Sequence, residues 1–183
     1  MSNGNVRKAA VAGAFYPSDP AALSKMLAEF FNAAVKKPIA GRPVALIAPH
    51  AGYKYSGKTA ADGYKQLLGE QYETVIVIAP SHTVFFQGVS VFDGDAYATP
   101  LGQIPINKKL AYKIGSISPS VYMSNKGHTG GAASGEHSLE VQLPFLQQVL
   151  GEFQLVAIVM GEQEESTCRA LGEVLATDRK SVV

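Results

Sequence analysis

The sequence predicts an α/β protein with a central, mostly parallel or mixed sheet flanked by helices. Three short apolar runs without polar alternation, at 44–48, 74–79 and 154–160, are typical of strands buried on both faces. Segments with apolar residues at helical spacing separate these runs. A strand, a helix and a second strand joined by short connections favour a right-handed parallel crossover. At 183 residues the chain can form one sizeable core, so we expect a single domain over 1–183.

The helices of the first half have clear signals. Ser18-Asp19-Pro20 places a capping residue before a proline at the first helical position, and Lys36-Lys37-Pro38 ends the helix. A second helix is expected from about Ser56 to Leu68, between the first two strands. The apolar face of the first helix is formed by Leu23, Met26, Leu27, Phe30 and Phe31.

After His82 the pattern changes to short extended segments separated by turn signals. We expect them to form an antiparallel excursion or a mixed edge of the sheet. Asn107 is expected to cap a short helix through Ile114, and residues 115–136 to form a long loop, which in a compact domain is often functional. The extended segments are 88–93, 96–98 and 103–106.

The C-terminal part returns to alternating helix and strand. We expect a helix over about 138–150, the buried strand at 154–160 and a helix over about 164–176. By the same alternation, another buried strand should begin at Lys180-Ser-Val-Val183. The pattern therefore predicts that the C-terminal part of the domain is missing from this sequence.

Composition excludes several classes of function. The formal net charge is +1 and only 17% of residues are charged, so neither a nucleic-acid surface nor an acidic tail is indicated. The single Cys168 excludes an internal disulfide framework and fits a reducing compartment. No secretory signal and no run long enough to span a bilayer are visible, so we expect a cytoplasmic protein that does not bind membranes.

Two similar strand ends each deliver a histidine. Ala-Pro-His50 follows the first apolar run and Ala-Pro-Ser-His82 follows the second. Proline cannot donate to a sheet ladder, so each strand should end there, and ligands bind beyond the carboxyl ends of parallel strands. His50 and His82 should therefore point into one crevice and could supply half of a metal site, because imidazole binds zinc, copper and iron. Either histidine could instead act as a general base or cap the next helix.

A third histidine lies at the start of the helix expected over 138–150. In Glu136-His137-Ser138-Leu139-Glu140, His137 and Glu140 are three residues apart and could bind a ligand or relay protons together. The pattern alone favours a simpler interpretation, a polar helix N-terminus with Ser138 as the cap and Glu140 stabilised by the helix dipole.

Other polar residues carry weaker signals. His128 lies between glycines and is expected to be an exposed loop residue. Ser81 beside His82 resembles a nucleophile next to its base, but adjacent side chains at a strand end usually diverge and no Gly-x-Ser-x-Gly motif is present. Cys168 is expected to pack as a small apolar side chain in a helix. Tyr53 and Tyr55 could line the crevice, whereas Tyr64 is expected to pack on a helix face.

Five motifs, spread in order across essentially the whole chain, resemble one known family. Each is weak alone, but their order makes the match specific. They are Gly13-Ala-Phe-Tyr-Pro17, Ile47-Ala-Pro-His-Ala-Gly-Tyr53, Pro80-Ser-His82, Thr99-Pro-Leu101 and Glu136-His-Ser-Leu-Glu-Val-Gln-Leu-Pro144.

The family is the Memo family, called AmmeMemoRadiSam system protein B in microbes. The resemblance implies an α/β fold like that of the class III extradiol dioxygenases, which are non-haem iron enzymes that cleave catechol rings. It also implies that His50 and His82 are metal ligands and that His137 is a pocket residue.

The sequence departs from this family in its length. Beyond the position of Val183, family members have a strand leading to a Ser-Ser-Asp-x-x-His segment and later a cysteine that completes the metal site. Cys168 does not occupy that position. We therefore expect weak metal affinity and an exposed apolar sheet edge that invites association between copies of the chain.

Three functions remain open at this point. The first is a metal-dependent redox enzyme in which His50 and His82 bind iron or copper and His137 acts as the catalytic acid or base. The second is a non-catalytic module that holds a peptide or a small molecule in the same pocket, although no arginine cluster indicates phosphate recognition. The third is a hydrolase that uses zinc and a bound water.

Overall fold

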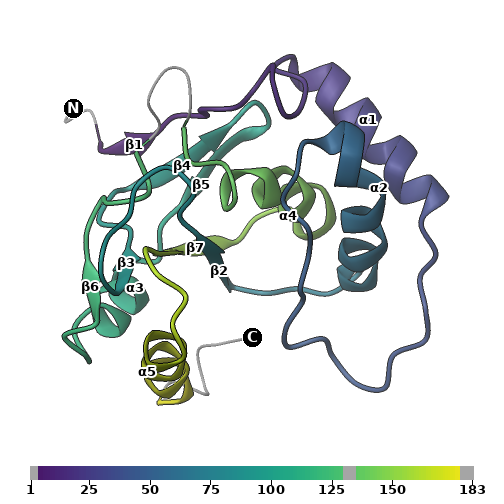
Figure 1. Ribbon diagram of the computed structural model, residues 1–183. Coiled ribbons are helices and arrows are strands. Elements are labelled where there is room, and N and C mark those ends of the chain that lie inside the picture. The colour runs from purple at the N-terminus through teal and green to yellow at the C-terminus, as the bar shows by residue number, and fades with distance from the viewer. Residues whose placement is uncertain (1–3, 130–134, 178–183) are drawn as a thin grey trace.

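The computed structural model describes residues 4–129 and 135–177, which form an α/β fold with two mixed sheets flanked by helices (Figure 1). The strands of the described residues are β1 Val6–Arg7, β2 Thr74–Pro80, β3 Val89–Val91, β4 Ala96–Thr99, β5 Gly102–Pro105, β6 Val121–Met123 and β7 Gln154–Met160. The helices are α1 Pro20–Ala33, α2 Tyr53–Tyr64, α3 Lys108–Ile114, α4 Leu143–Leu150 and α5 Glu165–Ala176, with 3₁₀ turns η1 Lys65–Leu67 and η2 Glu140–Gln142.

The larger sheet has the strand order β2-β7-β3-β6. β2 and β7 are parallel and pair from Thr74–Gln154 to Pro80–Met160, whereas β3 is antiparallel to β7 and parallel to β6. Every residue of β7 except Gln154 is buried, as expected for a central strand. The strands predicted at 74–79 and 154–160 are therefore confirmed.

The smaller sheet has the order β1-β4-β5, with β4 and β5 forming an antiparallel hairpin and β1 parallel to β4. This hairpin is the predicted antiparallel excursion. Its end is joined to the larger sheet, because Ile106 forms an isolated bridge with Leu155 of β7. The helix predicted to follow is also present, and the Asn107 side chain caps it by accepting from the backbone N–H of Leu110 at 3.0 Å.

Helices α1, α2 and α4 pack together beside the larger sheet, while α5 lies apart from them (Figure 1). The Asp19 carboxylate caps α1 by accepting from the backbone N–H of Ala22 at 2.8 Å, as its sequence predicts. The ring of Phe145 in α4 is the centre of the contact. It stacks on Tyr64 of α2 with centroids 5.1 Å apart and meets Phe31 of α1 edge-on at 5.9 Å.

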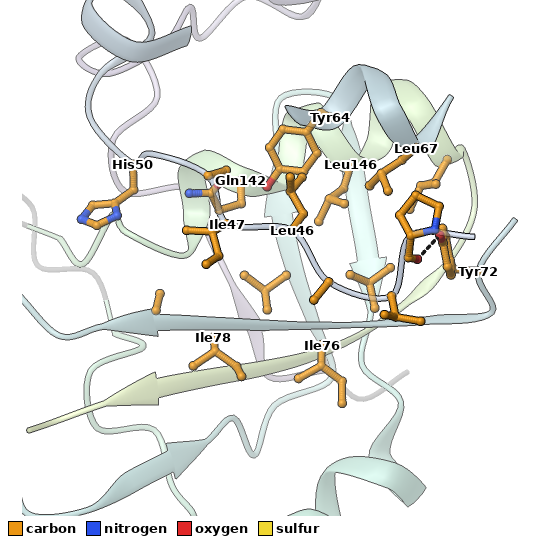
Figure 2. Close-up of a pocket in the computed structure, with 18 of the residues that line it drawn as sticks. Leu46, Ile47, His50, Tyr64, Leu67, Tyr72, Ile76, Ile78, Gln142 and Leu146 are labelled. Atoms are coloured by element: carbon orange, nitrogen blue, oxygen red, sulfur yellow. Dashed lines mark hydrogen bonds between the residues drawn. The ribbon is translucent and has the colours of Figure 1, made fainter. Parts of the chain in front are cut away.

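The strand predicted at 44–48 does not form. Among the described residues, this segment has no strand partner, and it lies across a groove from β2 (Figure 2). Its side chains are correspondingly open, with Val44 75% and Ile47 99% exposed. Apolar composition indicates a buried strand only when a neighbouring strand is present to pair with it. The expected parallel crossover from this segment to β2 is absent for the same reason.

Two further predictions need correction. The segment 115–136 contains β6, whose three residues were too short to be recognised in a polar sequence. The helix expected over 138–150 begins as the 3₁₀ turn η2 and becomes α-helical only at Leu143, one residue before Pro144. The strand expected from Lys180 onward lies outside the described residues.

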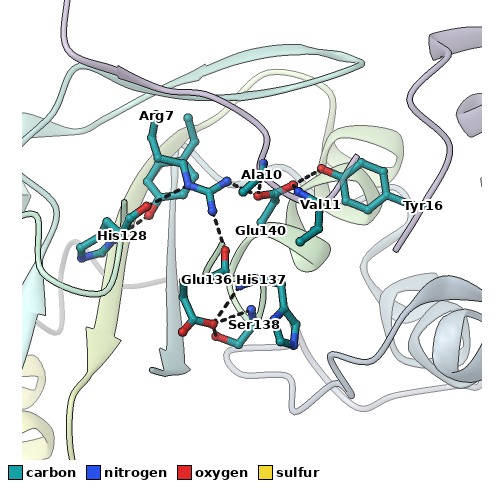
Figure 3. Close-up of polar contacts among 10 residues, drawn as sticks. Arg7, Ala10, Val11, Tyr16, His128, Glu136, His137, Ser138 and Glu140 are labelled. Carbon is teal, nitrogen blue, oxygen red and sulfur yellow. Dashed lines mark hydrogen bonds and ion pairs between the residues drawn. The ribbon is translucent and has the colours of Figure 1, made fainter. Parts of the chain in front are cut away.

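A buried ion pair fastens the N-terminal segment to η2 (Figure 3). The Arg7 guanidinium pairs with the Glu140 carboxylate, and both side chains are almost fully buried. Glu140 also accepts from the backbone N–H groups of Ala10 at 2.8 Å and Val11 at 3.1 Å and from the Tyr16 hydroxyl. Burial, followed by the charge of Glu140, raises the pKa of Tyr16 well above its ordinary value. The carboxylate therefore holds one charge partner and three hydrogen-bond donors away from water.

We expect Arg7→Met to destabilise the protein by about 3–5 kcal/mol, because it leaves the buried Glu140 carboxylate without its counter-charge. The double variant Arg7→Met/Glu140→Leu should recover a large part of this loss, because it removes both buried charges. Denaturant unfolding of the two variants and the unchanged chain measures the difference. A double variant no more stable than Arg7→Met would show that packing, not charge, explains the loss.

His128 is buried rather than exposed, contrary to the sequence prediction. Its side chain is 1% exposed and lies between the Tyr97 hydroxyl, 2.6 Å from Nδ1, and the Ser90 carbonyl oxygen, 3.1 Å from Nε2. A carbonyl oxygen can only accept, so Nε2 carries the hydrogen and Nδ1 accepts from Tyr97. Burial lowers the pKa of His128 to about 4. The flanking glycines indicated a loop, but they gave no signal that this loop buries the His128 ring.

The buried His128 should make the fold less stable in mild acid. The unfolded chain takes up the proton near the ordinary histidine pKa of about 6.5, whereas the folded chain takes it up only near 4, so stability falls as the pH drops between these values. We expect His128 to account for a loss of about 2 kcal/mol between pH 7 and pH 5. In His128→Gln the pH slope of the unfolding free energy should be shallower by this amount, and an unchanged slope would contradict the assignment.

Candidate functional site

Three histidines meet at one rim of the larger sheet. The Nε2 atoms of His50 and His82 are 3.0 Å apart, and the ring centroids of these residues are separated by 5.1 Å. The His137 ring lies 5.2 Å from the His82 ring and 6.3 Å from the His50 ring. The predicted convergence of His50 and His82 is confirmed, and His137 joins them.

Each histidine comes from a different segment. Ser81 makes the last backbone contact after β2 by donating to the Met160 carbonyl oxygen at 2.8 Å, and His82 follows at once. His50 leaves an irregular segment instead of a strand. Its preceding carbonyl, that of Pro49, accepts from the Gln142 side chain at 3.2 Å. His137 lies just before η2, so the three rings meet although only one of them follows a strand.

The Glu136 carboxylate holds the backbones of His82 and His137 together, and Figure 3 shows its contacts with His137 and Ser138. It is 2% exposed and accepts from the backbone N–H groups of His82, of His137 at 2.9 Å and of Ser138 at 3.0 Å. The Ser138 hydroxyl lies 2.8 Å from the same carboxylate and 2.6 Å from the Pro80 carbonyl oxygen at the end of β2. The carboxylate of Glu136, rather than Ser138, therefore satisfies the free N–H groups at this turn.

The hydrogen bonds to Glu136 set its charge. Burial raises the pKa of this carboxyl, but the backbone N–H groups of His82, Ser138 and His137 and the Ser138 hydroxyl together lower it below its ordinary value. The group is therefore an anion at neutral pH. The sequence offered no signal for this role, because a glutamate that accepts from a residue 54 positions away has no local spacing pattern.

The structure does not bring the side chains of His137 and Glu140 together, which the sequence left open as the alternative to a simple polar helix N-terminus. The Glu140 carboxylate belongs to the buried contact with Arg7, whereas the His137 ring packs on Phe15 with centroids 4.5 Å apart. The prediction assumed an α-helix from Ser138, but the chain forms a 3₁₀ turn at Glu140–Gln142. His137 lies before this turn, so the helical spacing on which the alternative depended does not apply to it.

His50 and His137 favour their neutral form, because the pKa of each is lowered. Burial lowers the pKa of His50, and the neighbouring His82 and His137 lower it further, with Glu136 opposing. Burial likewise lowers the pKa of His137, against the opposing charge of Glu136, and His82 adds to the decrease. A neutral imidazole has a free lone pair, so it can accept a proton or bind a metal ion.

The geometry fits two ligands of one metal ion. Two nitrogen ligands about 2.1 Å from one ion lie roughly 3 to 3.4 Å apart, depending on the angle between them, and the Nε2 atoms of His50 and His82, which are in hydrogen-bond contact, are 3.0 Å apart. Within residues 4–129 and 135–177, no group of three or more His, Cys, Asp or Glu side chains has the arrangement of a metal site. The described part of the chain thus offers an incomplete ligand set.

The other residues singled out in the sequence either make contacts away from the three histidines or lie at the edge of the crevice. The Ser81 hydroxyl donates to the Val84 carbonyl oxygen at 2.6 Å. Tyr55 is 81% exposed and borders the crevice, whereas Tyr53 is buried and donates to the Val141 carbonyl oxygen at 2.8 Å. Tyr64 packs on its helix face as predicted.

Cys168 is exposed on α5, contrary to the prediction that it packs as a small apolar side chain. The buried residues of this helix are Thr167, Leu171 and Val174. Cys168 follows Thr167 directly and so lies about 100° around the helix from it. Because only one face of this helix is buried, the prediction that Cys168 lies in a helix did not determine whether its thiol is buried.

The fold and this cluster define an α/β protein with imidazoles gathered at the end of a parallel strand pair. A family model described as Memo-like protein matches residues 7–182, and the chain belongs to this family. The resemblance drawn from the five sequence motifs is thereby confirmed.

Curated relatives agree with this assignment. A MEMO1 family protein of Aquifex aeolicus is 40% identical, with 97% of this chain and 65% of the relative covered. MEMO1 family proteins of Thermoplasma volcanium and Methanothermobacter thermautotrophicus are 34% and 36% identical, with 93% and 94% of this chain covered. The chain spans 61% and 63% of the lengths of these two relatives.

In the described ranges, no helix combines the length and the apolar character needed to cross a lipid bilayer.

We expect Glu136→Gln to destabilise the protein and to weaken the contacts that hold His82 and His137 in place. The amide replaces one acceptor oxygen by a donor that faces a backbone N–H group, which should cost about 2–3 kcal/mol. It should also speed hydrogen exchange at His82 or His137. Denaturant unfolding and exchange mass spectrometry measure both effects.

Glu165→Gln is the matched control for this substitution. It removes the exposed pair with Arg169 on α5 and should cost less than about 0.5 kcal/mol. Equal losses in the two variants would show that Glu136 is no more than an ordinary surface charge.

Proposed function

We propose that this Memo-like chain binds a divalent iron or copper ion through His50 and His82 and acts as a dioxygenase-like redox enzyme. The observation that carries the proposal is the 3.0 Å separation of the two Nε2 atoms. When bound, such an ion supplies open coordination positions and redox chemistry for an oxygen-bearing substrate. Both imidazoles stand at the surface end of their segments, so solvent and substrate can reach them.

His137 is the proposed catalytic acid or base. Its ring centroid is 5.2 Å from that of His82, so a substrate held at the His82 imidazole would also be within reach of His137. Burial lowers its pKa, which favours the neutral ring that can accept a proton. Contact with Phe15 restricts the orientation of the ring, and the Glu136 carboxylate fixes its backbone.

A second candidate is a non-catalytic module that holds a small molecule or a peptide. The crevice beside His50 is bordered by Phe15, Ile47 and Tyr55, whose side chains offer an apolar and aromatic surface. Such a surface can bind a ligand without any metal. A zinc-dependent hydrolase is a further alternative, in which the ion would activate a water molecule.

Metal binding separates these functions. The chain is titrated with Fe²⁺ under anaerobic conditions, with Cu²⁺ and with Zn²⁺, and bound metal is measured by elemental analysis and calorimetry. We expect iron or copper to bind, and the double variant His50→Ala/His82→Ala to lose at least about 10-fold in affinity. Preference for zinc would favour the hydrolase. A folded chain that binds none of the three ions would favour the ligand-binding module.

The variant His137→Gln distinguishes a catalytic role from a ligand role. We expect its metal affinity to stay within about 3-fold of that of the unchanged chain, because His137 is not proposed as a ligand. A loss as large as that of the double variant would make His137 a third metal ligand. His128→Gln is the control, because it removes a histidine that hydrogen-bonds Tyr97 and Ser90 instead of joining the rim.

A further inference from the structure

The backbone around His50 is held differently from that of the other two histidines. The backbone N–H groups of His82 and His137 both donate to Glu136, whereas His50 follows a segment that has no strand partner among the described residues. Over residues 44–50, the only hydrogen bond that the described part of the chain makes to the backbone runs from the Gln142 side chain to the carbonyl oxygen of residue 49, at 3.2 Å. A side chain, and not a sheet, thus holds the peptide that precedes His50.

The Gln142 amide is fixed in one orientation. Gln142 is 7% exposed, and its Oε1 accepts from the Tyr64 hydroxyl at 2.7 Å (Figure 2). The amide nitrogen therefore faces the other way, where it donates to the carbonyl oxygens of Pro49 at 3.2 Å and Ser138 at 3.4 Å. A flipped amide would turn its own oxygen toward two carbonyl oxygens, which can only accept. Burial raises the pKa of Tyr64 well above its ordinary value, so its hydroxyl keeps the hydrogen that it donates.

The two carbonyl groups that Gln142 binds belong to neighbours of two of the histidines. Pro49 directly precedes His50, and Ser138 directly follows His137. One amide group therefore joins the segment that carries His50 to the turn that carries His137.

We propose that Gln142 is the positioning residue for His50 and that it fixes the Nε2 atom of His50 against that of His82. The inference rests on the proposed function, because it concerns the same pair of imidazoles. Their 3.0 Å contact needs a defined backbone at His50, and no described strand supplies one. Tyr64 acts through Gln142 by orienting its amide. Removal of this amide frees the peptide before His50, so the ring moves away from His82.

Nuclear magnetic resonance of the metal-free chain tests the position of His50. The variant Gln142→Met replaces the amide by an apolar side chain of similar length. We expect it to lose the nuclear Overhauser contact between the ring C–H groups of His50 and His82, whose ring centroids are 5.1 Å apart. The contact between His82 and His137, at 5.2 Å, should remain, because Glu136 holds both residues. Retention of the first contact, or loss of both, would overturn the proposal.

Gln147→Met is the matched control for this substitution. Gln147 lies on α4 and its amide has the same kinds of partner, because Oε1 accepts from the Thr99 hydroxyl at 2.6 Å and the nitrogen donates to the Gly102 carbonyl oxygen at 3.4 Å. These partners belong to the β4–β5 hairpin and not to the histidine cluster. We expect both ring contacts to persist in this variant. Loss of the His50–His82 contact here would contradict a specific role for Gln142.

The variant Tyr64→Phe is a milder test that keeps the aromatic packing. It retains the ring that stacks on Phe145 and removes only the hydroxyl. We expect the contact between His50 and His82 to weaken, because the Gln142 amide can then rotate. This variant decides the question if Gln142→Met does not fold. An unchanged contact in folded Tyr64→Phe would overturn the proposal, because an amide that is free to rotate does not hold its partner.

Metal affinity gives a second measurement. Titration with Cu²⁺ alone should show an affinity at least about 10-fold lower in Gln142→Met and within about 3-fold of the unchanged chain in Gln147→Met. If the unchanged chain binds no metal, the proposed function fails, and the ring contacts still decide the role of Gln142. If Gln142→Met binds Cu²⁺ as tightly as the unchanged chain does, the positioning role fails and the proposed function stands.

Discussion

The arrangement of the histidine rim depends on a single buried anion, the Glu136 carboxylate. It binds the backbone of His82, which ends the β2 segment, and that of His137 and Ser138, which begin the η2 turn. Arg7 reaches the same region from the N-terminal segment, because its guanidinium donates to the Glu136 carbonyl oxygen and pairs with Glu140. Parts of the chain far apart in sequence are thus joined at one point by charge-assisted hydrogen bonds, which are stronger than neutral ones. The imidazoles occupy positions that this network defines.

Much of the fold could be predicted from local patterns. Asp19 and Asn107 are capping residues whose helices begin where the sequence indicates, and the apolar run at 154–160 is the fully buried central strand. These elements follow from short-range rules of helix capping and strand burial. The segment 44–48 shows the limit of such rules, because it has the composition of a strand but none of the described residues pairs with it. Strand formation depends on a partner, which local composition does not reveal.

The candidate site could also be predicted only in part. The convergence of His50 and His82 follows from the two Ala-Pro strand ends, and the structure has it even though His50 follows no strand. The roles of Glu136 and Glu140 were not visible, because each carboxylate accepts from residues more than 50 positions away. His128 was misplaced for a related reason: its hydrogen bonds to Tyr97 and Ser90 depend on how the loop folds against the sheet. Long-range polar contacts of this kind leave no periodic signal in a sequence.

The 3.0 Å contact between His50 and His82 also constrains the hydrogens on the two rings. When both rings are neutral, one Nε2 must donate and the other must accept, so the two residues have opposite tautomers. Binding of one ion by both Nε2 atoms requires both rings to have their hydrogen on Nδ1. If the pair binds the proposed ion, one ring must therefore change its tautomer, and the environment of that ring's Nδ1 would help to decide how readily the change occurs.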